Sequence, residues 1–324
     1  MADLHVITGG AGFIGVNLAH ALLERGLRVL LVDNLSRGRR EYVDLLPYPE
    51  RRTFVAADLA NPAEVSRIFE VISDAPNVEV WHLCANSDIP AGVNDPSVDL
   101  RDTFLTTYEL LRTMTKARIL QLNFSSTSAV YGDHGETLLT EETYVEPISN
   151  YGAMKLASEA AIRAWCEACG GRANVFRFPN VVGVPATHGV IFDFIQKLQK
   201  NPDTLAVLGD GSQRKAYLHV ADLVSAMLFI HENAQTGYNL FNIGPADAGI
   251  TVRDIAKQVR DLISPRATIE YGNENRGWIG DVPRFRYSVD KLRQLGWSTP
   301  HTSAEAIALA VKQITAQQLA PRTR

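Results

Sequence analysis

Cysteine and long apolar runs are the two features that this sequence most clearly lacks. Cysteine occurs three times in 324 residues, at Cys84, Cys166 and Cys169, which excludes a disulfide-built scaffold and favours a reducing cytosol. Cys166 and Cys169 form one C-x-x-C with no second pair, so we interpret them as helix residues rather than a zinc or redox site. No apolar run approaches the roughly 18 residues that span a bilayer, and the first residues do not follow a signal-peptide pattern. We therefore expect a cytoplasmic protein with no membrane partner.

An excess of charge of one sign is also missing. The 32 basic and 36 acidic residues give a formal net charge of −4, so no general attraction to nucleic acid or anionic lipid is expected. Apolar residues make up 46% and charged residues 21% of the chain, which is typical of a globular protein with a large core. A chain of this length accommodates one large domain or two of ordinary size.

Short runs rich in valine, isoleucine and leucine alternate with longer helical patterns in the first half of the chain. The runs are mostly apolar, as expected for strands of a parallel sheet that is covered on both faces. The fold class is therefore predicted to be α/β, with a Rossmann-type doubly wound parallel sheet. We predict strands within 5–8, 28–33, 53–58, 78–83, 119–126 and 174–180, and helices at 14–25, 62–72, 96–116 and 151–169.

The alternation becomes less regular after about residue 180. Helical patterns recur at 189–200, 221–233, 252–263 and 303–318, with short strands such as 238–244 between them. We predict that residues 1–180 form the first domain and that a return segment, about 216–245, joins its sheet. The remaining residues, about 181–215 and 246–324, are predicted to form a smaller C-terminal α/β domain that binds the substrate.

A glycine-rich turn separates the first predicted strand from the first predicted helix. In ITGGAGFIG, Gly10 suits the tight turn, Gly12 leaves room for a pyrophosphate, and Gly15 lets the helix pack closely on the strand. The N–H groups at the start of the helix, which carries a partial positive charge there, would face the phosphates. Asp33 ends the second strand 18 residues beyond Gly15, near the spacing of an acid that hydrogen-bonds the adenosine ribose, and it favours NAD over NADP.

The predicted dinucleotide site draws on several strand ends. Asp58 and Leu59, at the end of the third predicted strand, could contact adenine; a plain surface loop is the alternative. The remaining candidates from the first two strand ends are Gly9, Gly10, Gly12, Phe13, Ile14, Gly15, Asp33 and Asn34.

A second polar group follows the fifth predicted strand. Thr127 lies in SSTSAVYG, and Tyr151 and Lys155 lie four residues apart in YGAMK, on one face of a helix. Tyrosine with its ordinary pKa near 10 is a poor base at neutral pH, but a lysine cation and the positive ring of oxidised nicotinamide both favour the phenolate. We predict acid–base chemistry at Tyr151, with Thr127 bonding the substrate oxygen. A chance Tyr-x-x-x-Lys pair is the alternative, which the order of the three elements disfavours.

Eight segments, taken together and in this order, resemble one known family: TGGAGFIG, VDNLSRG, HLCA, SSTSAVYG, YGAMK, RFPNVVG, YLHVADL and RGWIGDVPRFRYSVDKLRQLGW. The chain resembles an extended short-chain dehydrogenase/reductase of the NAD-dependent sugar-nucleotide epimerase/dehydratase family, and within it the UDP-glucose 4-epimerase branch. The resemblance spans nearly the whole chain. It implies an isomerase with NAD as cofactor, and a nucleotide sugar as substrate, with UDP-hexoses as the first candidates.

The resemblance also implies roles for individual residues. Thr127, Tyr151 and Lys155 match the catalytic set, and Tyr151 and Lys155 also contact the cofactor. Leu83 and Ala85 in HLCA match further cofactor contacts. The implied substrate-binding residues are Ser87, Thr127, Asn180, Lys215, Arg276 and Phe285.

Several of these positions depart from the family pattern. The family usually has Arg-Asp where this chain has Lys215 and Ala216, which keeps a cation for the phosphates and loses the acid. Ser87 stands where close epimerases carry a lysine, and Thr103 aligns with an asparagine beside the cofactor. Phe285 resembles the bulky residue of versions that prefer plain hexoses. These differences leave GDP-, CDP- and dTDP-sugars open as substrates.

The second half-reaction separates members of the family. Relatives that eliminate water carry Asp and Glu after the Ser/Thr, and a decarboxylating relative keeps the Glu. Here these positions are Ser128 and Ala129, which cannot protonate a leaving hydroxyl or remove a carbon-bound proton. We therefore predict 4-epimerisation through a 4-keto intermediate with tightly bound NAD. A 4-dehydrogenase or 4-keto reductase is the alternative, and a non-catalytic NAD-binding regulatory protein is a third. The family also implies a homodimer in which helices 96–116 and 151–169 form a four-helix bundle.

Overall fold

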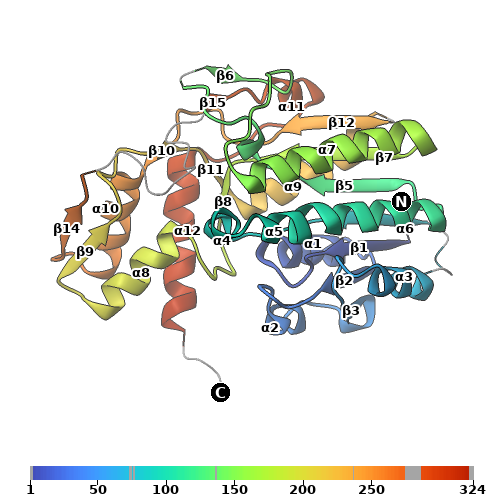
Figure 1. Ribbon diagram of the computed structural model, residues 1–324. Coiled ribbons are helices and arrows are strands. Elements are labelled where there is room, and N and C mark those ends of the chain that lie inside the picture. Colours follow the sequence, from blue (N-terminus) through green and yellow to red (C-terminus); the bar gives the residue numbers. More distant parts are fainter. Residues whose placement is uncertain are drawn as a thin grey trace. The chain divides into compact units, whose positions relative to one another are not determined.

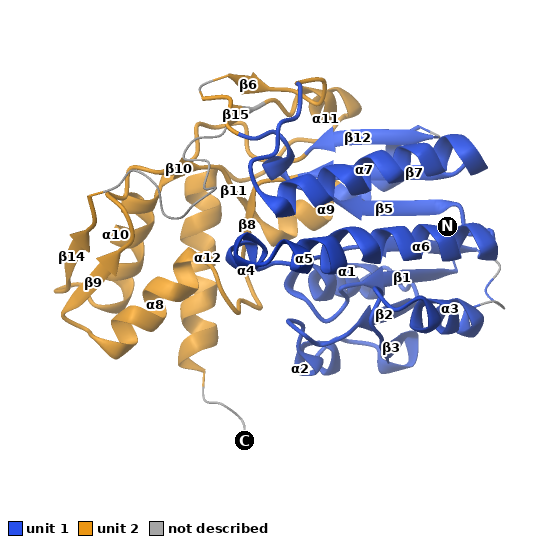
Figure 2. Ribbon diagram, in the orientation of Figure 1, with its two compact units in different colours: residues 1–132, 144–177, 227–242 blue, residues 133–143, 178–226, 243–324 orange. Residues whose placement is uncertain are grey.

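The chain folds into two compact units, each of which is built from three separate segments of the sequence. The computed structural model describes residues 3–72, 75, 77–135, 137–235, 237–273 and 286–320. Unit 1 comprises residues 1–132, 144–177 and 227–242, and unit 2 comprises residues 133–143, 178–226 and 243–324 (Figure 2). Both units therefore contain segments that are distant in the sequence.

These boundaries differ from the predicted ones in three places, of which the smallest is that the first domain's main segment ends at residue 177 rather than 180. The return segment is 227–242 rather than about 216–245, because β11 (Tyr217–His219) pairs with β8 (Asn180–Val182) inside unit 2. Residues 133–143, predicted in the first domain, belong to unit 2, where β6 (Leu138–Leu139) pairs with β15 (Arg286–Tyr287). Strands of two or three residues carry too little periodicity to be located from sequence.

Unit 1 contains a seven-stranded parallel sheet with the order β12-β7-β5-β4-β1-β2-β3 (Figure 1). The order reverses between β1 and β4, and ligands of such sheets bind beyond the carboxyl ends of the strands at this point. The predicted Rossmann-type parallel sheet is confirmed. Its strands are β1 (Leu4–Thr8), β2 (Val29–Asp33), β3 (Arg52–Ala56), β4 (Val78–His82), β5 (Gln121–Ser125), β7 (Arg172–Arg177) and β12 (Tyr238–Asn242).

Helices cover both faces of this sheet. Val80 packs in a core with α3 (Pro62–Val71), α6 (Thr106–Ala117) and α7 (Asn150–Cys169). The next residue, Trp81, points to the opposite face, where its ring lies 5.4 Å from that of His231 on α9 (Val220–Asn233). The first helix, α1 (Phe13–Glu24), lies on that face as well (Figure 1). Two short helices complete unit 1 near β2 and β4: α2 (Arg40–Asp44) and α4 (Ile89–Asn94).

The helix predicted over 96–116 is present, but it is not α-helical throughout. Its first turn is α5 (Pro96–Asp99), a π-helical segment follows over Leu100–Leu105, and α6 continues from Thr106. A π-helix takes one more residue per turn than an α-helix and is frequent at functional sites. The sequence shows no proline or glycine inside 97–116 that would mark this change.

Unit 2 is built on a separate apolar core that helices and short strand pairs enclose. Its helices are α8 (Val190–Lys200), α10 (Val252–Ile263), α11 (Asp290–Leu295) and α12 (Ser303–Leu319). Besides the two pairs named above, β9 (Thr204–Val207) pairs with β14 (Thr268–Tyr271), and β10 (Arg214–Lys215) pairs with β13 (Ile250–Thr251).

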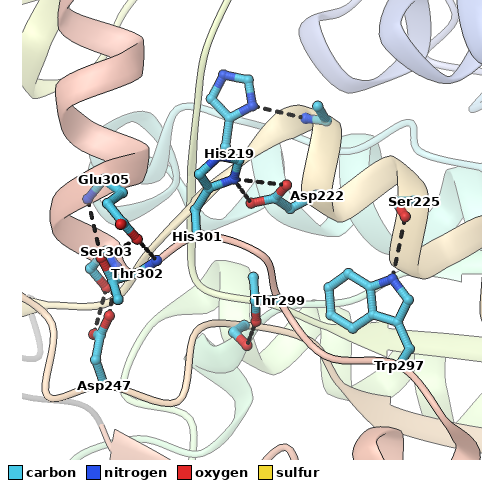
Figure 3. A network of polar contacts seen from close by, with 12 residues as sticks. His219, Asp222, Ser225, Asp247, Trp297, Thr299, His301, Thr302, Ser303 and Glu305 are labelled. Atoms are coloured by element: carbon cyan, nitrogen blue, oxygen red, sulfur yellow. Dashed lines mark hydrogen bonds and ion pairs between the residues drawn. The ribbon is translucent and has the colours of Figure 1, made fainter.

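Polar side chains fix the start of α12 within unit 2 (Figure 3). Thr302 and Glu305 form a reciprocal capping box, and the Asp247 carboxylate accepts hydrogen bonds from the N–H and hydroxyl of Ser303. His301 Nδ1 lies 2.9 Å from the buried Asp222 carboxylate.

Among the described residues, none of the helices combines the length and apolar character needed to cross a membrane.

Candidate active site

The glycine-rich turn between β1 and α1 is closely packed. Gly9 has a φ of +67°, and a Cβ there would lie 2.9 Å from the main-chain nitrogen of Cys84. A Cβ on Gly10 would lie 2.7 Å from that of Leu31, and one on Gly15 would lie 2.3 Å from the Gly9 oxygen. The left-handed residue of the turn is therefore Gly9. Gly10 and Gly15 let β2 and α1 approach the turn closely.

Asp33 connects this turn with the end of β2. Its Oδ2 accepts a hydrogen bond from the Ala11 N–H at 3.1 Å, and its Oδ1 accepts one from the Leu35 N–H at 2.8 Å. Burial raises the pKa of Asp33, and the two backbone hydrogen bonds oppose that rise. The neighbouring Asn34 accepts a hydrogen bond from the Ser36 N–H at 3.0 Å and so stabilises the loop after β2.

Asp58 already has partners at the end of β3. Its carboxylate pairs with Arg101 and accepts a hydrogen bond from the Ala60 N–H at 2.9 Å. Leu59 is buried with 3% exposure. The structure therefore gives Asp58 a role in joining the loop after β3 to the π-helical segment, and its contact with adenine stays a prediction.

The ends of β1 and β4 are joined by hydrogen bonds below the turn. The Leu83 N–H donates to the Thr8 oxygen at 3.1 Å, which continues the strand pairing by one residue and places Leu83 and Ala85 beside the turn. The ring of His82 lies between the hydroxyls of Thr8 and Thr107, at 2.7 and 3.0 Å. Burial, together with the nearby positive charge of Lys155, lowers the pKa of His82 to about 3, so this ring is neutral.

Thr127 and Tyr151 come together where α7 begins. Thr127 caps a 3-10 turn over Ser128–Val130, and Ser149 caps α7 by accepting from the Gly152 N–H at 3.1 Å. A Cβ on Gly152 would lie 2.7 Å from the Ala129 oxygen, so only glycine allows the helix to pass this close to the turn. Tyr151 lies in the first turn of α7, near enough to Thr127 for the Thr127 hydroxyl to lower the pKa of the phenol.

The protein groups around Tyr151 do not themselves favour its phenolate. Burial and the negative charge of Asp99 raise the pKa of Tyr151 to about 12, against a smaller lowering by the Thr127 hydrogen bond. The sequence predicted a lowering by Lys155 and by the nicotinamide ring. Of these two cations, the chain itself supplies Lys155, one helical turn away on α7.

Lys155 lies deep below the sheet edge with 1% exposure. Its Nζ donates to the Ser125 oxygen at 2.6 Å and lies 4.6 Å from the centre of the Phe124 ring. Burial lowers the pKa of Lys155 to about 8, with smaller opposing effects from Cys84 and Glu159. The catalytic candidates Thr127, Tyr151 and Lys155 thus all lie at the carboxyl end of β5 and the start of α7.

The candidates for substrate binding are dispersed. Ser87 is exposed in the loop between β4 and α4 of unit 1. In unit 2, Asn180 on β8 is paired with Tyr217 on β11. Lys215 lies two residues before Tyr217 in the chain, on β10, which pairs with β13. Arg214, next to Lys215, donates to the Gly249 oxygen at 2.9 Å. Arg276 and Phe285 lie outside the described residues.

Comparisons with known proteins agree with this geometry. Residues 5–244 match the model of the NAD dependent epimerase/dehydratase family. The chain belongs to this family. It is 30% identical to a UDP-glucose 4-epimerase of Azospirillum brasilense over 93% of this chain and 89% of the relative. A crystal structure of a UDP-galactose 4-epimerase has a TM-score of 0.85 and 34% identity, with 98% and 99% of the two chains covered. The UDP-glucose 4-epimerase of Thermus thermophilus in complex with NAD has a TM-score of 0.84 and 28% identity, with 96% and 99% covered.

NAD, the cofactor of this epimerase/dehydratase family, fits the residues around the glycine turn. No side chain among the described residues caps the start of α1, and the first turn contains no acidic residue. The N–H groups of Phe13 and Ile14 are thus suited to a diphosphate. The Asp33 carboxylate, which the turn and β2 hold in place, is an acceptor of the kind that a ribose hydroxyl needs.

Sequence reasoning missed two residues of the epimerase site, Asn86 and Asp99. Both are buried, and Asn86 Nδ2 donates to Asp99 Oδ1 at 2.9 Å. Asp99 acts on Tyr151 electrostatically. In the sequence, Asp99 is one acid within a helical pattern that also contains Asp95 and Asp102, and helical spacing alone does not indicate which of these is buried.

Proposed function

We propose that the chain is an NAD-dependent 4-epimerase of UDP-sugars, of the UDP-glucose/UDP-galactose type. The observation that carries this proposal is the assembly of Thr127, Tyr151 and Lys155 at the carboxyl edge of the sheet, beside the glycine turn, in a member of the epimerase/dehydratase family. The UDP-glucose and UDP-galactose 4-epimerases among its relatives support this substrate class.

In this proposal Tyr151 exchanges a proton with the oxygen on C4 of the sugar. Thr127, which bonds the phenol, also orients that oxygen, and Lys155 supplies the buried positive charge. The glycine turn and Asp33 would hold NAD, which would supply a reversible hydride acceptor for the two transfers at C4. Between the two transfers the substrate is a 4-keto sugar, and return of the hydride to its opposite face inverts C4.

The residues after Thr127 support epimerisation rather than elimination or decarboxylation. Ser128 and Ala129 form the 3-10 turn that Thr127 caps. Neither side chain has a carboxyl group to serve as a second acid or base. The reaction that remains needs only the proton exchange at Tyr151 and the reversible hydride transfer.

We propose that unit 1 binds the NAD cofactor and that unit 2 binds the nucleotide sugar. Unit 1 contains the glycine turn and Asp33 and would bind NAD. Unit 2 contains Asn180 and Lys215, whose amide and ammonium groups suit the diphosphate of a nucleotide sugar.

We also propose a homodimer through the π-helical segment with α6 and α7. Leu100 and Tyr108 are 46% and 49% exposed, and Phe104 lies between them, with its ring 6.3 Å from that of Tyr108. Their spacing of four residues gives an apolar stripe that a second copy could cover. Sedimentation analysis of Tyr108→Glu against the unchanged protein tests this; an unchanged mass would contradict it.

The free thiols of all three cysteines support a cytoplasmic location.

The decisive experiment is conversion of UDP-galactose to UDP-glucose by purified protein without added cofactor. We expect turnover with no accumulation of NADH, and a loss of about 100-fold or more in Tyr151→Phe and Lys155→Met. Lys116→Met, at an exposed position on α6, is the matched control. A requirement for stoichiometric cofactor would instead indicate a dehydrogenase or reductase. Near-native rates in both variants would contradict the proposed catalytic residues.

A further inference from the structure

Asp99 is a fully buried carboxylate that the proposed reaction does not use. It ends α5, has 0% exposure, and accepts a hydrogen bond from Asn86 through Oδ1. Its Oδ2 is buried and has no hydrogen-bond partner among the described residues. Because a buried carboxylate oxygen without a partner is destabilising, this group requires a specific explanation.

The loop after β4 fixes the position of Asp99. Asn86 Nδ2 also donates to the Asp88 oxygen at 2.9 Å, and Asn86 Oδ1 accepts from the Asp88 N–H at 2.8 Å. The Asn86 N–H donates to Thr103 Oγ1 at 3.2 Å. A Cβ on Gly92 would lie only 1.8 Å from Asp99 Oδ2, so α4 passes directly over the carboxylate. These contacts leave Asp99 little freedom to turn toward solvent.

The same contacts extend to the start of α7. The Gly92 oxygen, on the α4 turn above Asp99, accepts a hydrogen bond from Asn150 Nδ2 at 2.8 Å. Asn150 directly precedes Tyr151. Asp99 is thereby linked through one glycine and one asparagine to the backbone that carries the phenol.

We propose that Asp99 is a positioning residue for Tyr151, which fixes the start of α7 through Gly92 and Asn150 and holds its carboxylate near the phenol. This proposal rests on the acid–base role proposed above for Tyr151. Asp99 would keep a proton on Tyr151 in the resting protein, so that the phenolate forms only when further positive charge is present. The effect of Asp99 on the Tyr151 pKa has the sign that this requires.

Other charged groups near the pair are largely compensated by partners of their own. Asp88 pairs with Arg37 at 3.0 Å, and Glu159 pairs with Arg177 at 2.6 Å. No ion pair involves Asp99 among the described residues; burial raises the pKa of Asp99, and its hydrogen bond from Asn86 opposes that rise. Asp102 on the π-helical segment, which pairs with Arg101, acts on Asp99. The other titratable groups on the elements around the pair are Asp88 before α4, Lys155 and Glu159 on α7, and His82 and Cys84 at and after the end of β4.

The test is a spectroscopic pH titration of Tyr151 in the full chain. Asp99→Asn removes the charge with little change of shape, and the tyrosinate absorbance of a matching Tyr151→Phe protein is subtracted to isolate this phenol. We expect the Tyr151 midpoint to fall by about 1 pH unit, and the acid limb of the kcat profile to move in the same direction. Asp95→Asn, at an exposed cap four residues earlier, is the control and leaves both unchanged.

A second variant, Asp99→Ser, separates charge from shape. It is smaller than Asn and also uncharged, so the midpoint falls in both variants if charge is responsible. An unchanged midpoint, or failure of both variants to fold, would show a purely structural role and overturn the inference. Full activity of Tyr151→Phe would refute the acid–base role of Tyr151 instead, whereas the titration would still report on the coupling to Asp99.

Discussion

The ammonium group of Lys155 is hydrogen-bonded to the main-chain oxygen of Ser125 at 2.6 Å. A main-chain oxygen at the end of β5 therefore holds the cation, and the Phe124 ring lies beneath it at 4.6 Å. One neutral acceptor compensates a buried charge only partly, and burial accordingly lowers the pKa of Lys155 to about 8. The site thus contains a lysine that is harder to keep charged than a surface lysine.

The first prediction concerns stability against pH. The folded pKa of Lys155, about 8, lies below its ordinary value of 10.5, so between these values the unfolded chain binds more protons and stability rises with pH. The full difference corresponds to about 3 kcal/mol. Lys155→Met removes this dependence. We expect the variant to be more stable than the unchanged protein near neutral pH, and the difference to shrink toward about pH 10.

Urea unfolding of both proteins across this pH range measures the effect. The pKa of Tyr151 is raised in the folded state, so stability falls above about pH 10 in both proteins. This contribution is the same in both and cancels when their free energies of unfolding are compared. A difference that stays constant with pH would contradict the buried charge.

The second prediction concerns the choice of cofactor. Asp33→Asn removes the charge and replaces one acceptor oxygen by a donor, so the Ala11 or Leu35 N–H loses its partner. We expect the Kd for NAD to rise about 10- to 100-fold, as for loss of a hydrogen bond to a charged group. The Kd for NADP should rise less, because the repulsion of its 2′-phosphate is also removed. Calorimetric titration of cofactor-free protein measures both; Glu41→Gln on α2 is the control.

The third prediction compares two glycines with the same backbone conformation. Gly9 and Gly170 have φ values of +67° and +69°, but only Gly9 has atoms within 4 Å of an added Cβ. Gly170→Ala should destabilise the protein by about 1–2 kcal/mol, which is the cost of a left-handed backbone conformation at a residue with a Cβ. Gly9→Ala should destabilise by about 1–3 kcal/mol more, because the added methyl group overlaps the Cys84 main chain. Equal melting temperatures for the two variants would disprove the close packing of the turn.

The fourth prediction concerns the buried ion pair behind the catalytic residues. Arg177 donates to both carboxylate oxygens of Glu159 at 2.9 and 2.6 Å, and both side chains are about 5% exposed or less. Glu159→Gln leaves the guanidinium buried without its charge partner and should destabilise by about 3–5 kcal/mol. The double variant Glu159→Leu with Arg177→Met should recover most of this loss. Asp44→Asn, which breaks an exposed pair with Arg40, should change stability by less than about 1 kcal/mol. Urea midpoints decide between these outcomes.

The sequence was sufficient for the residues whose role depends on local geometry. The glycine turn, Asp33 and the Tyr151–Lys155 pair follow from a strand end or a helical spacing, and the structure places them at one sheet edge. The parallel sheet itself followed from apolar runs that alternate with helical patterns. The positive φ of Gly9 was not anticipated, because the close approach of the Cys84 main chain to Gly9 is made across strands.

Features that depend on distant contacts were not predictable. The π-helical segment interrupts a continuous helical pattern, and Asp99 is buried because Asn86 and Gly92, several residues earlier in the chain, pack against it. Asp95 and Asp99 are four residues apart, so helical spacing puts them on the same side of the helix and predicts equal burial, although Asp95 is exposed. The unit boundaries escaped prediction for the same reason, since two-residue strands such as β6 and β15 are defined by their partners.

The last strand of the large sheet has a consequence for biosynthesis. β12 pairs with β7 over five residues, yet the ribosome makes it only after residues 178–226 of unit 2. Until then the nascent chain presents the bare edge of β7, and exposed edges recruit other strands. Any product that terminates before Tyr238 keeps that edge open and is prone to aggregate, so a truncation within residues 178–226 of unit 2 also damages the nucleotide-binding half.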